Sequence, residues 1–419
     1  MALGSLQRLI ASQRVVNMSA QLPIIVVGAG TAGCTVVSHL ANNTDHPILV
    51  VEPGRYGNDD DPQFLNFSDS DLLVTTQDGY VQARAMGGGS AVNGMLLTGD
   101  EPEHLHGLTR MARTSDVGVV GHELLALGGR LSRLWWNGGR WNPARAVHHL
   151  IEERRVSHVS GTVTKIVHDN GVVTGVLCDG ELINTKAVVL CAGAIASPGL
   201  LLASGLHELS PAIGEGLQNH PTVTAQFAVA AEQFTRFDTA VVREWSTQSG
   251  GRVLNVSYER VAKNHADIGA LSVSLMNPVS RGRVELSADG LPKANFRYLE
   301  AREDLVNMVE GVRDFITLLR TGNFTVDPTS IFVEGQALVD LLKWDDDELG
   351  SWLRQSVKGV SHASSSCAQA VNLLGQLVGV ENCWVADASV LPRVPTETPA
   401  APVTMEALRI ARSIGETLS

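Results

Sequence analysis

A glycine-rich loop near the start of the chain has the residue types and spacing of a dinucleotide-binding site. Residues 28–33 have the sequence GAGTAG and follow residues 23–27, a β-branched run typical of a buried parallel strand. The glycines would let the backbone approach a pyrophosphate, and the start of the next helix would supply free N–H groups and partial positive charge. Glu52, after the next strand, would accept hydrogen bonds from an adenosine ribose. The alternative is a glycine-rich turn in an ordinary α/β unit.

A second glycine-rich stretch, residues 84–95, has the sequence RAMGGGSAVNGM. Three consecutive glycines carry no side chains, so a flat planar group could lie directly on the backbone. Ser90 and Asn93 would place polar groups near that surface. A flexible loop is an equally good interpretation of this stretch taken alone.

Predicted elements at both ends of the chain would position these loops. Apolar runs at 187–190 and 384–386 predict strands, and a helix from about Thr404 closes the chain. Residues 156–176 alternate in polarity and turn at 169–171, which predicts a β-hairpin. The domain that carries the two loops is therefore expected to be discontinuous.

The middle of the chain has a different pattern. Residues 222–230 and 253–258 predict sheet, and apolar side chains at helical spacing over 305–319 predict a helix. Acidic residues 345–348 are typical of the N-terminus of a helix. Together these patterns predict an α/β protein with a second region of sheet and helix.

The composition excludes several classes of function. The chain has 419 residues, of which 44% are apolar, so it can bury a core and is not mainly disordered. Its 44 acidic residues exceed its 32 basic ones, which argues against nucleic acid or an anionic membrane as a partner. Five scattered cysteines predict reduced thiols, a cytoplasmic protein and no metal site.

Two apolar or basic segments do not predict a membrane or export function. Residues 187–206 carry no charge, but their glycine, serine and proline content makes a poor membrane-spanning helix, so no integral membrane segment is expected. Residues 1–20 lack the apolar length of a signal peptide and are interpreted as a frayed lead-in, with Met18 as an alternative start.

These motifs, taken in order, resemble those of the glucose–methanol–choline (GMC) family of FAD oxidoreductases. The resemblance covers nearly the whole chain from Pro23 onward, except residues 100 to about 150. The matching segments are GAGTAG with Glu52, MGGGSAVNGM (86–95), AGAIASPGLLLASGL (192–206), IGEGLQNHP (213–221), NPVSRGRVEL (277–286) and VADASVLPRVP (385–395). The mycofactocin-associated branch of the family is one candidate, because its C-terminal segment is also short of a second histidine.

The resemblance implies a Rossmann-like FAD-binding domain and an antiparallel-sheet plus helix substrate-binding domain. The first would comprise residues 20–100, 151–222 and 363–419, the second 223–362, and a shortened active-site cover 101–150. The resemblance also implies oxidation of an alcohol CH–OH group, in which a base removes the hydroxyl proton and hydride passes to flavin N5. The short cover favours a bulky alcohol, and the electron acceptor stays open.

The resemblance also names the residues that would do this chemistry. The family's catalytic histidine corresponds to His362, and an imidazole with an ordinary pKa of about 6.5 can accept a proton near neutrality. Some members attach FAD covalently through a histidine where this chain has Val92, so the FAD is expected to be non-covalent. Together with the glycine motif, the resemblance assigns cofactor binding to Gly28, Ala29, Gly30, Thr31, Ala32, Gly33, Glu52, Gly87, Gly88, Ser90, Asn93, Val163, Asp387 and Pro402.

The chain departs from the family pattern around this histidine. The family's second His or Asn corresponds to Ala400, which can neither donate a hydrogen bond nor share a proton. Ser365 and Ser366 replace the glycine and threonine that follow the histidine in the family. The alternative is therefore a flavoprotein that binds FAD with weakened catalysis. An NAD-linked dehydrogenase would leave the second glycine stretch unexplained, and His220 is interpreted as structural.

Overall fold

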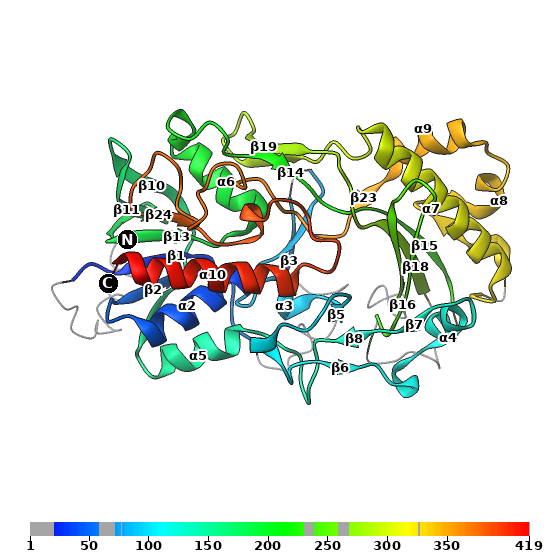
Figure 1. The fold of residues 1–419 in the computed structure, drawn as a ribbon, viewed down its shortest axis with the longest axis horizontal. Coiled ribbons are helices and arrows are strands. Elements are labelled where there is room, and N and C mark those ends of the chain that lie inside the picture. Colours follow the sequence, from blue (N-terminus) through cyan, green and yellow to red (C-terminus); the bar gives the residue numbers. More distant parts are fainter. Residues whose placement is uncertain are drawn as a thin grey trace, which may run out of the picture.

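The computed structural model describes residues 21–57, 72–76, 78–229, 237, 239–258, 268–325 and 327–418. The elements form two neighbouring regions, one around a parallel sheet and the other around a large antiparallel sheet (Figure 1). The predicted lead-in at 1–20 lies outside the described residues.

The first region is built on a five-stranded parallel sheet with the strand order β24-β13-β1-β2-β9. The strands are β1 (Ile24–Val27), β2 (Ile48–Val51), β9 (Val156–Val159), β13 (Ala187–Leu190) and β24 (Cys383–Val385). All except β9 are apolar throughout, as expected for strands whose side chains are mostly covered on both faces. β9 and β24 form the two edges of the sheet. Segments from both ends of the chain therefore lie in one sheet.

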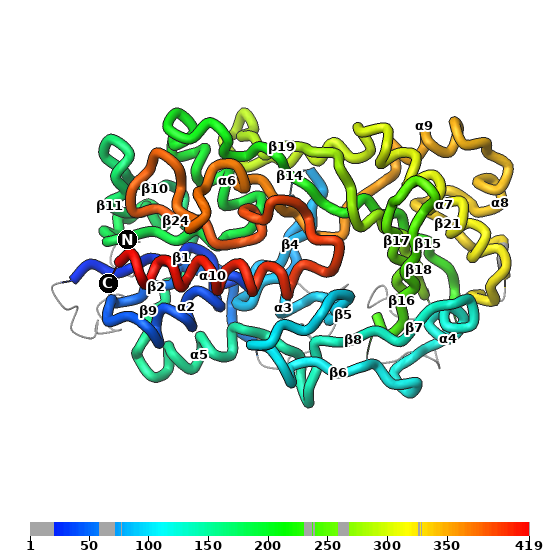
Figure 2. Tube along the Cα trace, in the orientation of Figure 1, coloured from blue at the N-terminus to red at the C-terminus, as the bar shows by residue number. Residues whose placement is uncertain are grey.

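Two long helices cover this sheet and run alongside each other (Figure 2). They are α2 (Thr31–Asn43) and α10 (Ala400–Leu418). The prediction that the last helix begins at about Thr404 is wrong by four residues. Pro402 fits within the first turn of α10 because the N–H groups there have no intrahelical partner to lose.

A third helix, α5 (Ala144–Glu152), also packs against α2. All but its last two residues lie in the segment 101–150 that was expected to form the cover. Its side chains Ala144, Val147 and Leu150 are buried in the same core as the parallel sheet. This part of the predicted cover is therefore a structural part of the first region.

A three-stranded antiparallel sheet and a helix complete the first region. The strands are β10 (Val163–Asp169), β11 (Val172–Cys178) and β12 (Glu181–Asn184), and the helix is α6 (Gly193–Ala203). The turn between β10 and β11 lies at Asn170 and Gly171, which confirms the predicted hairpin. The first part of the predicted hairpin is instead β9, which pairs with β2 in the parallel sheet.

The second region is built on an eight-stranded sheet with the order β22-β21-β15-β18-β17-β16-β7, to which β23 adds beside β15. The strands are β7 (Arg130–Leu131), β15 (Pro221–Ala228), β16 (Val241–Ser246), β17 (Arg252–Tyr258), β18 (Ile268–Leu275), β21 (Phe332–Val333), β22 (Gln336–Ala337) and β23 (Lys358–Gly359). The strands predicted at 222–230 and 253–258 correspond to β15 and β17.

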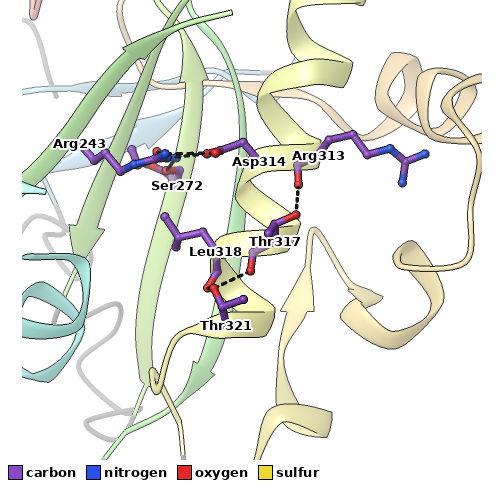
Figure 3. Close-up of polar contacts among 8 residues, drawn as sticks. Arg243, Ser272, Arg313, Asp314, Thr317, Leu318 and Thr321 are labelled. Carbon is purple, nitrogen blue, oxygen red and sulfur yellow. Dashed lines mark hydrogen bonds and ion pairs between the residues drawn. The ribbon is translucent and has the colours of Figure 1, made fainter. Parts of the chain in front are cut away.

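The helix α7 (Arg302–Thr321) packs on this sheet and confirms the helix predicted over 305–319. Arg243 on β16 forms an ion pair with Asp314 on α7, with nitrogen–oxygen distances of 2.5 and 3.1 Å (Figure 3). The predicted helix start at 345–348 is confirmed by α9 (Asp346–Ser356), because Asp345 caps it by accepting the Glu348 N–H.

The remaining helices and strands are shorter. They are β3 (Leu73–Thr75), β4 (Val81–Ala83), α3 (Gly89–Val92), β5 (Leu96–Leu97), β6 (Arg110–Met111), α4 (Val119–Ala126), β8 (Arg133–Leu134), β14 (Glu215–Leu217), β19 (Gly282–Leu286), β20 (Pro292–Asn295) and α8 (Leu338–Leu341). All five cysteines are buried and free. Across the described residues, no helix combines the length and apolar character that a membrane span requires.

Candidate active site

One large cavity lies at the carboxyl ends of the parallel strands, and its volume is about 700 Å³. Gly28, Glu52, Ala192 and Asp387 line it, and each follows closely after β1, β2, β13 or β24. β2 lies on one side of β1 and β13 on the other, so the cavity opens where the strand order reverses. Open α/β sheets bind ligands at this position.

The first glycine loop places the N-terminus of α2 at the cavity. Gly30 is the N-cap, no side chain caps the helix, and its first turn contains no acidic residue. The first N–H groups therefore remain available to an anion. A Cβ on Gly30 would lie 3.9 Å from its nearest non-neighbouring atom, so this position faces open space. A Cβ on Gly33 would lie 2.0 Å from the Gly28 carbonyl oxygen, so Gly33 instead allows α2 to pack closely on the loop.

The second glycine stretch contacts the first. The Gly87 N–H donates to a carbonyl of the first loop (2.7 Å), and the hydroxyls of Thr31 and Ser90 lie 2.7 Å apart. Gly88 has a φ of +52°, and a Cβ there would lie 2.8 Å from the Cα of Gly30. Only glycine accepts both the left-handed backbone and this close approach. The stretch is therefore a packed part of the cavity wall.

Glu52 is buried at the end of β2 and is held by two backbone donors. Its carboxylate accepts the Ala29 N–H at 2.8 Å and the Gly54 N–H at 2.6 Å. Burial raises the pKa of Glu52, and the two hydrogen bonds oppose that rise. A carboxylate has about four lone-pair positions, so acceptor capacity remains for hydroxyl groups in the cavity.

Asp387 is also buried, and its oxygens already have partners. One oxygen accepts the Gly193 N–H (2.8 Å) and the Ser197 hydroxyl (2.6 Å), and the other accepts the Ser389 N–H (2.9 Å). The carboxylate therefore joins the start of α6 to the segment after β24. Its direct contribution is to shape the cavity wall.

Most of the predicted cofactor-binding residues meet at this one cavity. Those that line it are Gly28, Gly30, Thr31, Ala32, Glu52, Gly88, Ser90, Asn93, Val163 and Asp387. Ala29, Gly33, Gly87 and Pro402 do not line it, and the first three act through the backbone contacts described above. Asn93 is oriented by Arg140, which donates to its side-chain oxygen (2.9 Å) and its carbonyl (2.6 Å).

His362 lines the same cavity from the second region. It follows β23, which pairs antiparallel with the start of β15 at Gly359 and Pro221. Backbone hydrogen bonds of 2.9 Å in both directions between Gln218 and Ser364 continue this pairing. The segment that carries His220 is thereby fixed beside the segment that carries His362.

The two histidine rings contact each other directly. Their Nδ1 atoms lie 2.9 Å apart and the rings are nearly perpendicular, at 89°. His220 is fully buried, and its Nε2 lies 2.8 Å from the Pro395 carbonyl oxygen. Burial lowers the pKa of His220 to about 4 and, together with the neighbouring His220, holds the pKa of His362 well below its usual range. Both rings are therefore neutral at pH 7.

The burial of His220 makes the stability of the protein depend on pH. His220 titrates near 6.5 in an unfolded chain but at about 4 in the fold, so the unfolded state binds more protons between these values. The free energy of unfolding is expected to fall by about 3 kcal/mol as the pH drops from 7 to 4. Urea unfolding across this range measures the slope. His220→Asn should flatten it, and equal slopes in both proteins would contradict the prediction.

The segment after His362 contains a strained residue. Ser365 has a φ of +75°, a left-handed conformation that costs a non-glycine residue roughly 1–2 kcal/mol. Its hydroxyl is buried without a hydrogen-bond partner among the described residues. The adjacent Ser366 instead donates to the Ala194 carbonyl (2.6 Å) and anchors the segment to α6. The serine that replaces the family glycine thus occupies a position where glycine would be unstrained.

The end of the cavity near His362 is lined by uncharged side chains. Leu254, Val256 and Tyr258 lie on one face of β17, and Ser274 and Met276 come from the neighbouring strand or its end. Ala400, where the family has a second His or Asn, also lines the cavity and brings no polar side-chain atom. Sequence reasoning did not identify these β17 and β18 residues as site residues, because no motif marks them.

Comparisons with known proteins identify one family. The family models for the GMC oxidoreductase N- and C-terminal parts match residues 136–222 and 278–407, just over half of the chain. An uncharacterised GMC-type oxidoreductase of Rhodococcus erythropolis is 24% identical, covering 59% of this chain and 54% of its own length. The oxygen-dependent choline dehydrogenase of Paraburkholderia phytofirmans is 27% identical, covering 66% and 60%. This chain thus spans little more than half the length of these relatives.

Solved structures give the same result for the fold. The pyridoxine 4-oxidase from Mesorbium loti has a TM-score of 0.75 at 17% identity and covers 94% of this chain and 99% of its own. The formate oxidase of Aspergillus oryzae RIB40 has a TM-score of 0.73 at 16% identity, covering 96% and 99%. The expected α/β fold class is therefore confirmed.

The residues around the cavity fit the FAD that this family binds. Gly30 and Gly193 both face open space, where a Cβ would have no atom closer than 3.9 Å, so a ligand can approach the backbone at α2 and α6. The uncapped start of α2 suits a diphosphate, and the Glu52 carboxylate suits ribose hydroxyls. The family models, the fold and this fit together show that the chain belongs to the GMC oxidoreductase family of FAD-dependent flavoproteins.

Proposed function

We propose that this protein oxidises an alcohol CH–OH group with FAD as its cofactor and His362 as the base. The observation that carries the proposal is that His362 lines the same cavity as Gly30 and Glu52. When bound, FAD supplies an acceptor for the hydride that leaves the alcohol carbon. The names of relatives, choline dehydrogenase and 5-(hydroxymethyl)furfural oxidase, support alcohols as the class of substrate.

The role of the chain is to accept the proton and to exclude water. Because the pKa of His362 lies well below its usual range, the ring is unprotonated at neutral pH and its lone pair is free to accept the hydroxyl proton, as a weaker base than an ordinary imidazole. The Nδ1 of His362 faces His220, and its Nε2 has no hydrogen-bond partner among the described residues. A substrate hydroxyl beside Nε2 would therefore meet a free lone pair in a largely apolar enclosure.

The lining near His362 favours an uncharged alcohol with a hydrocarbon body. Leu254, Val256 and Met276 supply apolar surface, and Ser274 and Tyr258 supply neutral polar atoms. Among the described residues at this end of the cavity, no carboxylate or guanidinium would hold a charged substrate. Burial of apolar surface, at about 25 cal/mol per Å², would then be the main source of substrate affinity.

A flavoprotein with weakened catalysis is the second candidate. Ala400 supports it, because the position carries no polar atom that could share the proton with His362. The strain at Ser365, three residues after His362, supports it as well. Under this alternative, FAD would be bound tightly but would not be reduced by substrate.

Anaerobic mixing with a panel of alcohols separates these proposals. Purified holoprotein would be mixed with benzyl alcohol, hexanol, 5-(hydroxymethyl)furfural, choline and glucose while the visible absorbance of the flavin is recorded. Loss of the oxidised spectrum with the uncharged, apolar alcohols is expected. Bleaching by choline or glucose alone would overturn the proposed substrate class. A spectrum that stays oxidised with every alcohol would favour the second candidate.

A further inference from the structure

The contact between His220 and His362 determines where the protons of the two rings lie. The Pro395 carbonyl can only accept a hydrogen bond, so the His220 Nε2 that contacts it at 2.8 Å must carry a hydrogen. A neutral imidazole has one N–H, which leaves the Nδ1 of His220 as an acceptor. The Nδ1 of His362, 2.9 Å away, must therefore donate. The remaining nitrogen of His362, Nε2, then holds the free lone pair.

We propose that His220 is a positioning residue that holds His362 in the tautomer whose basic Nε2 faces the cavity. The inference rests on the proposed function, because a base must present a lone pair to the substrate hydroxyl. With Nε2 protonated instead, His362 could only donate a hydrogen bond to that hydroxyl. His220 thus gives the chain an ordered second histidine at a place different from Ala400, where the family's second His or Asn was expected.

Backbone contacts make this arrangement rigid. The side-chain oxygen of Asn219 accepts the N–H of His220 (2.9 Å) and the N–H of His362 (3.1 Å). The amide nitrogen of Asn219 donates to the Tyr298 hydroxyl (2.9 Å), which fixes the orientation of the amide. A Cβ on Gly359 would lie 2.0 Å from that nitrogen, so a glycine is needed there. The two rings are therefore held by their own backbones as well as by their mutual hydrogen bond.

Two substitutions of His220 each keep one of its two ring hydrogen bonds, the one to His362 or the one to the Pro395 carbonyl, and remove the other. In His220→Asn, the amide oxygen lies near the former position of Nδ1 and can still accept from His362. In His220→Gln, the amide nitrogen lies near the former position of Nε2 and can still donate to Pro395, but the acceptor for His362 is lost. His220→Gln is expected to lower kcat roughly 10- to 100-fold with little change in KM, the range found when an orienting partner of a functional histidine is removed. His220→Asn should stay within a few-fold of wild type.

The tautomer itself is measured by NMR of holoprotein labelled with ¹⁵N-histidine, with His362→Gln used to assign the His362 signals. The expected result is a protonated Nδ1 and an unprotonated Nε2 in wild type and in His220→Asn, and loss of this pattern in His220→Gln. A wild-type His362 protonated at Nε2 would overturn the inference, as would full kcat in His220→Gln. If no alcohol reduces the wild-type flavin, the proposed function fails, and the NMR result still decides whether His220 sets the tautomer.

Discussion

His362→Gln is expected to slow flavin reduction by an alcohol by about 10²–10⁴-fold, the usual contribution of a positioned general base. A glutamine amide has a similar length but cannot accept a proton at neutral pH. FAD should remain bound, because the glycine loops and Glu52 lie at a different part of the cavity from His362. Anaerobic stopped-flow measurement of the reduction rate at saturating alcohol tests this, with the flavin content determined on the same sample.

A matched control for this variant is His122→Gln on α4. His122 is exposed and does not line the cavity, so its replacement should leave the reduction rate unchanged. Reduction of His362→Gln at the wild-type rate would contradict a role for His362 as the base. Loss of bound FAD in that variant would show instead that the side chain supports the cofactor site.

Gly30→Ala is expected to weaken FAD binding without unfolding the protein. The added Cβ meets no protein atom closer than 3.9 Å, and the backbone at Gly30 (φ −70°) suits alanine. The methyl group would instead occupy the space through which a diphosphate reaches the N–H groups of α2. Overpacking of this kind costs roughly 1–3 kcal/mol, or about 5- to 150-fold in the Kd for FAD. Titration of apoprotein with FAD, followed by flavin fluorescence, measures the change.

Gly33→Ala is the comparison for this variant because it lies in the same loop but faces the protein. Its Cβ would lie 2.0 Å from the Gly28 carbonyl oxygen, so the apoprotein itself should lose stability. The Tm of apo Gly30→Ala should match that of wild type, and the Tm of apo Gly33→Ala should be lower. Equal Kd values for FAD in wild type and Gly30→Ala would show that the start of α2 is not the diphosphate site.

Local sequence patterns predicted the parallel sheet well because its strands are buried on both faces. β1, β2 and β13 are continuous apolar runs, and the glycine loop and Glu52 follow the first two directly. The pattern failed at β9, whose sequence VSHV alternates in polarity like an exposed hairpin strand although it pairs with β2. After Val156, the residues of β9 are exposed or only partly buried, so its sequence does not distinguish the two pairings.

The contact between the two histidines at the cavity could not be predicted in the same way. His220 and His362 are 142 residues apart, and nothing in either local sequence indicates the other. Their contact arises because β23 pairs with β15 and because Asn219 binds both backbones. The apolar lining from β17 and β18 is likewise a product of strand register. Motifs marked the part of the cavity at the glycine loops and Glu52, whereas the part near His362 depends on tertiary packing.

The position of β24 and α10 in the first region has a consequence for how the chain folds during its synthesis. β24 pairs with β13, and α10 lies along α2, so residues 383–418 complete a sheet whose glycine loop begins at residue 28. On the ribosome, that loop emerges long before β24, which pairs with β13, and α10, which packs along α2. A nascent chain therefore exposes the face of α2 that α10 covers until residues 383–418 have been made, and the cavity wall at Asp387 can be completed only then.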